Sequence, residues 1–441
     1  MTLPHISHWV QYHQLIHNAK TIKSFGMVTQ VIGLVIEGIG PISAIGDMCH
    51  IQRREGEKPI PAEVVGFKEN KTLLMPLGDT KGIEPGCRII PMGGSAQARV
   101  GKKLLGRVLD GLGNLIDNKG PIALGEEYPL YGESPHPLMR KRISEPIDVG
   151  IRAINSLLTL GKGQRIAIFS GSGVGKSVLL GMMARHTKAQ VNVVALIGER
   201  GREVREFIER DLGEEGLRRS VVIVATSDQP PLIRIRGVYL ATSIAEYFRD
   251  QGDDVLLMMD SITRYAMASR EVGLAIGEPP TSKGYTPSVF AQLPRLLERV
   301  GMTPDQGSIT GIYNVLVEAD DVNDPIADAT RSIVDGHIVL SRELANQNHY
   351  PSIDILGSIS RVMVDIVDQD HLSARNQLVS SMATYKRAED LIQIGAYVEG
   401  SNPQIDDAIK KMPKINMFLR QGINEKVNFE SSLSHLKSLF Q

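Results

Sequence analysis

The sequence predicts an α/β fold with a parallel sheet at its centre, a small β domain before it and a helical domain after it. The chain has 441 residues, more than one ordinary core accommodates, so two or three domains are expected. From about residue 145 to 345, apolar β-prone runs alternate with helix-like stretches, which is typical of a parallel sheet with helices on both faces. Short β-prone runs precede this region and helical patterns follow it.

The first 144 residues are predicted to hold three segments. Residues 1–20 form a weakly amphipathic leading segment, which is either a frayed end or a helix that docks a partner. Residues 21–92 contain short runs such as MVTQVIGLVIEG and TLLMPL between turn-like stretches, which predicts a small β-barrel or sandwich. Residues 93–144 contain clustered prolines. Because such prolines do not lie in core helices or central strands, we expect a connector there.

Residues 145–365 are predicted to form the core, with strands at six apolar runs: RIAIF, VNVVALIG, SVVIVAT, DVLLMMD, ITGIYNVLV and HIVLS. Helix-like stretches lie between most of these runs, so the strands are expected to be parallel. Residues 366–441 are predicted to be a helical C-terminal domain that is interrupted at VEGSNPQ.

The composition narrows the class of protein. A formal net charge of −1 and 5% aromatic residues give no overall attraction to nucleic acid or anionic lipid. The two cysteines, Cys49 and Cys87, make neither a zinc pattern nor a disulfide framework, which fits a reducing compartment. We find no signal peptide, and no apolar run approaches the roughly 20 residues that span a bilayer. We therefore expect a cytosolic protein that can still dock on a membrane machine.

The stretch FSGSGVGKSVLL at 169–180 is predicted to bind phosphate. Backbone N–H groups hold a phosphate when they all point inward, which needs φ values that glycine permits and side chains disfavour. The start of the following helix adds its positive end. Lys176 then reaches the outer phosphates, and the Ser177 hydroxyl takes a Mg²⁺ position. The predicted nucleotide-binding residues of this loop are Gly171, Ser172, Gly173, Val174, Gly175, Lys176, Ser177 and Val178.

Two acidic residues are predicted at the ends of strands. Asp260 ends the run DDVLLMMD, and Glu199 follows VNVVALIG. The carboxyl ends of parallel strands meet at the sheet edge where ligands bind in open α/β folds. Asp260 is therefore predicted to orient the metal, and Glu199 to polarise the water that attacks the phosphate. Arg200 comes directly after Glu199 and is predicted to help hold the phosphate charge.

The stretch GERGREVREFIERDLG at 198–213 resembles the hexameric ATPases of the rotary ATP synthase superfamily, and among them most closely those of flagellar and virulence type III protein export. A small residue such as Ser170, where the strict phosphate-loop pattern has glycine, is usual in the export branch. The resemblance covers nearly the whole chain and implies a RecA-like P-loop core with a parallel sheet, an N-terminal small β-barrel and a helical C-terminal domain. Further matching stretches are TSDQPPLIRIRG, DSITRYAMASREVGLAIGEPPTSKGYTPSVFAQLPRLLERVG, ILGSISRVM and GAYVEGSNPQIDDAI.

The resemblance also implies roles for residues that spacing alone does not assign. Arg361, in SISRV, matches the arginine finger that acts on the γ-phosphate of a neighbouring subunit. Tyr350, in NHYPSID, matches the aromatic that stacks on adenine, and Arg264, in SITRYA, matches a phosphate-side arginine. The loop at 273–287, GLAIGEPPTSKGYTP, resembles the segment that faces the central pore of the ring and is expected to contact a central stalk protein.

The function predicted in this way is that of a Mg²⁺-dependent ATPase of the flagellar type III export apparatus. The family implies a homohexamer, a stator-like regulatory partner at residues 1–20, and contacts with the export gate and with chaperone–substrate complexes. It also implies a cytoplasmic location with peripheral attachment to the inner membrane, and no nucleic-acid partner.

Several alternatives stay open at this point. A virulence secretion ATPase or the catalytic subunit of a rotary ATP synthase would use the same core chemistry. An RNA-translocating hexamer would need basic residues among exposed aromatics, yet Phe25 and Phe67 are the only aromatics between 21 and 92. The presence of both Lys176 and Glu199 argues against a non-catalytic subunit of the same fold.

Overall fold

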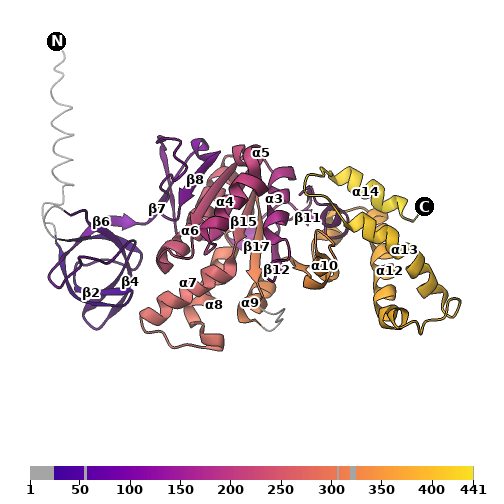
Figure 1. Ribbon diagram of the computed structural model, residues 1–441. Helices are drawn as coiled ribbons and strands as arrows, with labels where there is room; N and C mark the ends of the chain where they lie inside the picture. The colour runs from indigo at the N-terminus through magenta and orange to yellow at the C-terminus, as the bar shows by residue number, and fades with distance from the viewer. Residues whose placement is uncertain (1–23, 54–56, 305–306, 318–323, 441) are drawn as a thin grey trace, which may run out of the picture. The chain divides into compact units, whose positions relative to one another are not determined.

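The computed structural model describes residues 24–53, 57–304, 307–317 and 324–440 (Figure 1). The predicted docking segment, residues 1–20, lies outside these ranges. The chain divides into two compact units, Met1–Ala96 and Gln97–Gln441.

The first unit is a closed barrel of six antiparallel strands in the order β1-β2-β5-β4-β3-β6. Pairing of β1 with β6, where Gly26 faces Ile89, closes the barrel, so the barrel alternative is confirmed over the sandwich. Side chains alternate between the two faces of each strand, and the inward positions are apolar. These buried residues are Val28, Ile36, Cys49, Ile51, Ala62, Val64, Leu74 and Ile89. The strands are β1 (Gly26–Ile32), β2 (Val35–Ile39), β3 (Asp47–Gln52), β4 (Ile60–Lys68), β5 (Lys71–Pro76) and β6 (Arg88–Ser95).

The second unit is built on a nine-stranded sheet, in which eight strands follow the order β19-β18-β12-β17-β15-β13-β14-β8 and β16 pairs with β17. Strands β18 to β8 in this order are parallel, and β19 and β16 pair antiparallel to their neighbours. Each of the six predicted apolar runs is a strand here, so the parallel core is confirmed. The bounds are β8 (Arg107–Asp110), β12 (Arg165–Ser170), β13 (Val191–Ile197), β14 (Ser220–Ala225), β15 (Asp254–Asp260), β16 (Gly301–Met302), β17 (Ser308–Leu316), β18 (Gly336–Leu340) and β19 (Ile353–Ser360).

Strand β8 lies within residues 93–144, the stretch predicted to be a connector. Leu109 of β8 pairs with Ile223 of β14, so the sheet reaches beyond the predicted start of the core at residue 145. The prolines that indicated a connector begin at Pro121, after this strand. They therefore gave no information about residues 107–110. The domain limits otherwise remain predictions.

Helices of the second unit pack on the sheet and also connect its strands (Figure 1). Helix α6 lies against β13, β14 and β15, and α9 lies against β12 and β17. The helices are α2 (Arg152–Leu157), α3 (Lys176–His186), α4 (Gly201–Glu206), the π-helix η3 (Phe207–Leu212), α5 (Gly213–Arg218), α6 (Pro231–Asp250), α7 (Ile262–Ala275), α8 (Pro287–Leu297), α9 (Pro325–Ile333) and α10 (Arg342–Asn346). The remaining short elements are β7 (Gln97–Val100), η1 (Lys102–Leu104), β9 (Glu126–Pro129), η2 (Pro137–Met139), β10 (Pro146–Ile147), β11 (Leu160–Gly161) and η4 (Ser282–Gly284).

The C-terminal part is helical, as predicted (Figure 1). Its helices are α11 (Met363–Ile366), α12 (Gln369–Gln393), α13 (Pro403–Leu419) and α14 (Phe429–Ser438). The predicted interruption, VEGSNPQ, falls between α12 and α13, which pack against each other. Asn402 caps α13 by accepting a hydrogen bond from the backbone N–H of Gln404 at 3.0 Å. Within the described ranges, no helix combines the length and the apolar character needed to cross a membrane.

A buried ion pair fastens α6 to the segment that follows α8. The Arg299 side chain is 1% exposed and donates from Nε to Glu246 Oε1 at 2.8 Å and from Nη2 to Glu246 Oε2 at 2.5 Å. It also donates to the carbonyl of Leu130 at 2.7 Å and to Ser243 Oγ at 3.0 Å. Because each nitrogen of this buried cation has an acceptor, the desolvation cost of the pair is offset within the core.

We predict that Arg299→Met lowers the free energy of unfolding by about 3 kcal/mol, because it leaves the Glu246 carboxylate buried without its cation. Urea unfolding followed by circular dichroism measures this change. Lys411→Gln is the matched control, since it removes an exposed pair with Asp407 (2.7 Å) on α13 and is expected to cost less than about 0.5 kcal/mol. An Arg299→Met protein that unfolds at the wild-type urea concentration would contradict the prediction.

Candidate functional site

The predicted site residues gather where β12, β13 and β15 end. These strands are parallel, with β15 lying between β13 and β17 and with β12 on the other side of β17. The glycine-rich loop leaves β12, Glu199 follows β13, and Asp260 is the last residue of β15. Parallel pairing therefore places the loop and both acids at the carboxyl edge of the sheet, as expected from the sequence.

The loop between β12 and α3 has the backbone that the phosphate interpretation requires. Gly173 and Gly175 have φ values of +78° and +87°, in the left-handed region that favours glycine. A Cβ atom on Gly175 would also lie 3.3 Å from the ring of Tyr350. Helix α3 begins at Lys176, so its free N–H groups point toward the loop. A side chain at position 175 would both strain this turn and crowd Tyr350.

Lys176 lies between the two acids. Its Nζ is 2.7 Å from Asp260 Oδ1 and 3.3 Å from Glu199 Oε1. The side chains of Lys176, Glu199 and Asp260 are 13%, 14% and 4% exposed. Burial disfavours the charged lysine, but attraction to the two carboxylates outweighs burial and raises the pKa of Lys176. The structure thus keeps this ammonium charged at neutral pH.

Glu199 has the electrostatics of a group that exchanges protons near neutrality. Burial, together with repulsion from the Asp260 carboxylate, raises the pKa of Glu199 to about 7, while Lys176 opposes this shift. A carboxylate with a pKa near the working pH is suited to accept a proton from a nearby water.

Asn314 is a site residue that the sequence analysis missed. It is fully buried on β17 and donates from Nδ2 to Asp260 Oδ1 at 2.7 Å. Its Oδ1 lies 3.1 Å from Ser170 Oγ, which donates to it. The hydroxyl of Ser170 therefore orients the amide that orients Asp260. A polar residue inside the apolar run ITGIYNVLV was the available signal.

Arg264 lies beside Gly198, in the turn after β13 that carries Glu199. It is on α7, and a Cβ atom on Gly198 would lie 2.8 Å from its side chain. The Nε atom of Arg264 is buried and has no hydrogen-bond partner among the described residues. This N–H is therefore free to donate to a further partner, and the phosphate-side role of Arg264 stays a prediction.

The other two predicted arginines are not brought to Lys176 within this chain. Arg200 is 82% exposed and pairs with Glu203 at 3.4 Å. Arg361 donates its backbone N–H to Asp335 O at 3.0 Å and from Nη1 to Val334 O at 3.4 Å. These carbonyls precede β18, which is parallel to β12, so Arg361 lies at the opposite edge of the sheet from the glycine-rich loop.

A cavity of about 400 Å³ opens beside the glycine-rich loop. Tyr350, which is 40% exposed, and Val178 of α3 line it, as expected for a base-binding site. Ser352 also lines the cavity, and its hydroxyl donates a hydrogen bond to the carbonyl of Val174 at 2.7 Å. Part of the wall comes from the segment after α13, a contribution that no sequence signal indicated. The residues from that segment are Gln421, Gly422 and Ile423.

The donor set fits a magnesium ion that binds together with phosphate. Ser177 supplies a hydroxyl and Asp260 a nearly buried carboxylate, and Mg²⁺ usually takes one or two such protein ligands plus phosphate oxygens and water. In the described part of the chain, no group of three or more His, Cys, Asp or Glu side chains is placed to hold a metal by itself. The Ser177 hydroxyl and the Asp260 carboxylate suit a metal whose remaining ligands are phosphate oxygens and water.

Three family models match consecutive parts of the chain. The nucleotide-binding domain of the ATP synthase alpha/beta family matches residues 150–360, and the beta-barrel domain of the same family matches residues 28–93. The T3SS EscN ATPase C-terminal domain matches residues 367–438.

Individual relatives match almost the full chain. The flagellum-specific ATP synthase of Bacillus subtilis is 54% identical over 424 residues, which are 95% of each chain. The assembled ATPase EscN of the enteropathogenic E. coli type III secretion system has a TM-score of 0.89 and 47% identity, covering 94% of this chain and 99% of EscN. EscN in complex with its central stalk EscO gives a TM-score of 0.87 and 46% identity, with the same coverage.

We predict that Asn314→Leu lowers ATP hydrolysis roughly 10- to 100-fold, because it removes the amide that orients Asp260. Phosphate release at saturating ATP and magnesium measures the effect. Thr310→Val is the matched control: Thr310 is also buried on β17, but it bonds to the backbone N–H of Gly163 at 3.0 Å, at the other end of the strand. Equal activities of Asn314→Leu and the wild type would remove the positioning role.

Proposed function

Since the chain belongs to the ATP synthase alpha/beta family, we propose that it is the ATPase of a flagellar type III export apparatus. In this role it would couple ATP hydrolysis to the export of flagellar proteins, by releasing chaperones or unfolding substrates. The observation that carries the ATPase chemistry is the contact of Lys176 with both Asp260 and Glu199 beside the glycine-rich loop. The flagellar assignment is supported by 54% identity to a flagellum-specific relative.

The proposed reaction is in-line attack of water on the γ-phosphorus of ATP. Glu199 accepts the proton from the attacking water, the bond between the γ-phosphorus and the bridging oxygen breaks, and the electron pair leaves with ADP. Lys176 and Arg264 stabilise the negative charge on the phosphate oxygens. Magnesium, held by Ser177 and Asp260, would supply further neutralisation of the phosphates when bound. Arg200 would join them after reorienting from its solvent-facing position.

The proposed assembly is a homohexameric ring in which each site is completed by a neighbour. Arg361 lies at the sheet edge opposite the glycine-rich loop, so it cannot reach the γ-phosphate bound by its own chain. A head-to-tail interface would bring this edge of one subunit to the site of the next, and such interfaces form a ring when the rotation between subunits closes. Arg361 would then act in trans as an arginine finger.

The proposed partners are those that the family resemblance implies. The loop at 273–287 would contact a central stalk protein; the relative EscN has been solved in complex with its central stalk EscO. Residues 1–20 would bind a stator-like regulatory protein, and the ring would receive chaperone–substrate complexes and work with the export gate. We place the protein in the cytoplasm, bound peripherally to the inner-membrane export apparatus, with no nucleic-acid partner.

A pull-down from native cells separates this proposal from its alternatives. Flagellar export components are the expected partners. Virulence secretion components, or a membrane ion-channel ring with stalk subunits, would overturn the flagellar assignment and leave the ATPase chemistry intact.

We predict that Lys176→Ala and Glu199→Gln each lower ATP turnover roughly 100-fold or more. Lys176→Ala removes a phosphate ligand and should also weaken nucleotide binding, whereas Glu199→Gln keeps the shape of the side chain and should retain it. Glu209→Gln is the matched control, because Glu209 lies in the same charged stretch but pairs with Arg205 at the surface (2.8 Å). Normal turnover by Glu199→Gln would refute its role.

We also predict that Lys176→Ala and Arg361→Ala subunits, each inactive alone, regain activity when mixed. In a mixed ring, roughly one interface in four joins an intact Lys176 to an intact Arg361 of the neighbour. Phosphate release after co-assembly measures the recovery, and each variant mixed with itself is the control. A mixture that stays inactive, although the subunits assemble, would exclude Arg361 as a group supplied in trans.

A further inference from the structure

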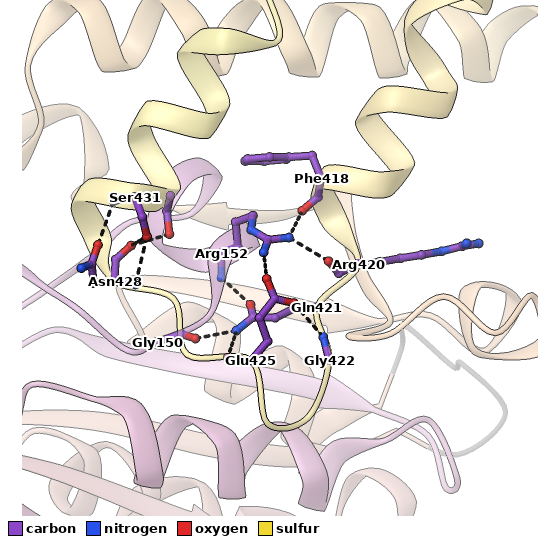
Figure 2. Close-up of polar contacts among 10 residues, drawn as sticks. Gly150, Arg152, Phe418, Arg420, Gln421, Gly422, Glu425, Asn428 and Ser431 are labelled. Atoms are coloured by element: carbon purple, nitrogen blue, oxygen red, sulfur yellow. Dashed lines mark hydrogen bonds and ion pairs between the residues drawn. The ribbon is translucent and has the colours of Figure 1, made fainter.

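The segment between α13 and α14 returns to the nucleotide-binding core and is clamped there by Arg152 (Figure 2). Arg152 is the first residue of α2. Its Nη1 donates to the carbonyls of Phe418 at 3.0 Å and Arg420 at 2.9 Å, which end α13. Its Nη2 pairs with Glu425 Oε1. One guanidinium therefore holds both the end of a C-terminal helix and the loop that follows it.

The loop is also tied to itself and to the start of α2. Gln421 accepts from the backbone N–H of Arg152 at 2.8 Å and donates from Nε2 to Gly150 O at 2.9 Å (Figure 2). The second carboxylate oxygen of Glu425 accepts from the backbone N–H of Gly422 at 3.0 Å. Glu425 thus bridges Arg152 and Gly422, and its carboxylate fixes the curvature of residues 420–425.

The clamped loop touches the elements that form the base-binding cavity. The backbone N–H of Gln421 donates to the carbonyl of Tyr350 at 3.0 Å. Arg185, in the last turn of α3, donates from Nη2 to Ile423 O at 2.9 Å. Gln421, Gly422 and Ile423 are themselves part of the cavity wall. No phosphate-binding residue of the glycine-rich loop has a hydrogen bond to this loop among the described residues.

The Glu425 carboxylate neutralises the buried Arg152 guanidinium, so the contacts of Arg152 with the loop depend on Glu425. The Arg152 side chain is 9% exposed, whereas Glu425 is 41% exposed. Burial lowers the pKa of Arg152, which reflects how costly this buried cation is. Among the described residues, Glu425 is the one acidic side chain in an ion pair with it. Removing the carboxylate should therefore loosen the loop while leaving the α13 contacts of Arg152 in place.

We propose that Arg152 and Glu425 are positioning residues that hold the 420–425 loop as a wall for the nucleotide base and thereby couple base binding to the C-terminal helices. This inference rests on the proposed function, in which ATP occupies the cavity beside Tyr350. The clamp acts on the base end of the ligand. Its loss should therefore weaken ligands that carry a base and spare those that consist of phosphates alone.

Calorimetry on the full-length chain tests the clamp proposal. It measures the binding of ADP and of inorganic pyrophosphate, each with Mg²⁺. We expect Glu425→Gln to raise the Kd for ADP roughly tenfold, the loss of one charged hydrogen bond, and to leave the Kd for pyrophosphate unchanged. The KM for ATP should rise by a similar factor with kcat retained. Glu215→Gln is the matched control, since Glu215 pairs with Lys426 of the same segment in an exposed contact of 3.5 Å that is expected to contribute little.

Equal weakening of ADP and pyrophosphate, or no weakening of ADP, would overturn the clamp proposal. If the wild-type chain itself fails to bind ADP with Mg²⁺, the proposed function fails instead, so the two failures are distinguishable. Hydrogen exchange of the wild type provides a test that needs no variant. ADP should slow exchange of the amides at Gln421 and Gly422 and pyrophosphate should not; equal effects of the two ligands would contradict the proposal.

Discussion

The contact of Lys176 with Asp260 and Glu199 is the interaction on which the rest of the site depends. Two carboxylates with little exposure share one ammonium, so the bare site cannot accept a polyphosphate without more positive charge. Arg264 offers a buried N–H that lacks an acceptor among the described residues, and a divalent cation on Asp260 would supply the rest. In the proposed reaction, magnesium and the arginines would supply this positive charge at the strand ends.

Strand β12 explains why, in the proposed ring, Arg361 would act on the site of a neighbouring subunit. Its carboxyl end carries the glycine-rich loop, while at its amino end Arg165 pairs with Asp335 at 3.1 Å. The carbonyl of Asp335 in turn accepts the backbone N–H of Arg361. Six residues of extended strand separate these ends by roughly 20 Å. The strand that fixes the phosphate loop therefore also keeps Arg361 far from it.

Much of this arrangement could be predicted from local patterns, because the strands are continuous apolar runs and the loop has a fixed spacing. Glu199 and Asp260 were singled out because Glu199 directly follows such a run and Asp260 ends one. Asn314 was missed because its role depends on pairing of β17 with both β12 and β15, a long-range property that no periodicity reveals. Strand β8 was missed because its four residues are too few to show a periodic pattern. The loop at 420–425 was missed because it contacts residues that lie more than two hundred positions earlier in the sequence.

In the proposed complex, the two ends of the nucleotide are held by structures of different kinds. The phosphates meet the edge of a buried sheet, whose strands and orienting side chains leave little freedom. The proposed wall for the base is part of a connection between two C-terminal helices and is fastened by Arg152 and Arg185. A displacement of α13 would therefore move the base wall before it disturbed Lys176, so a partner acting on the C-terminal helices can change nucleotide affinity without altering the groups that break the phosphate bond. By linkage, nucleotide binding would then change the affinity for that partner by the same factor.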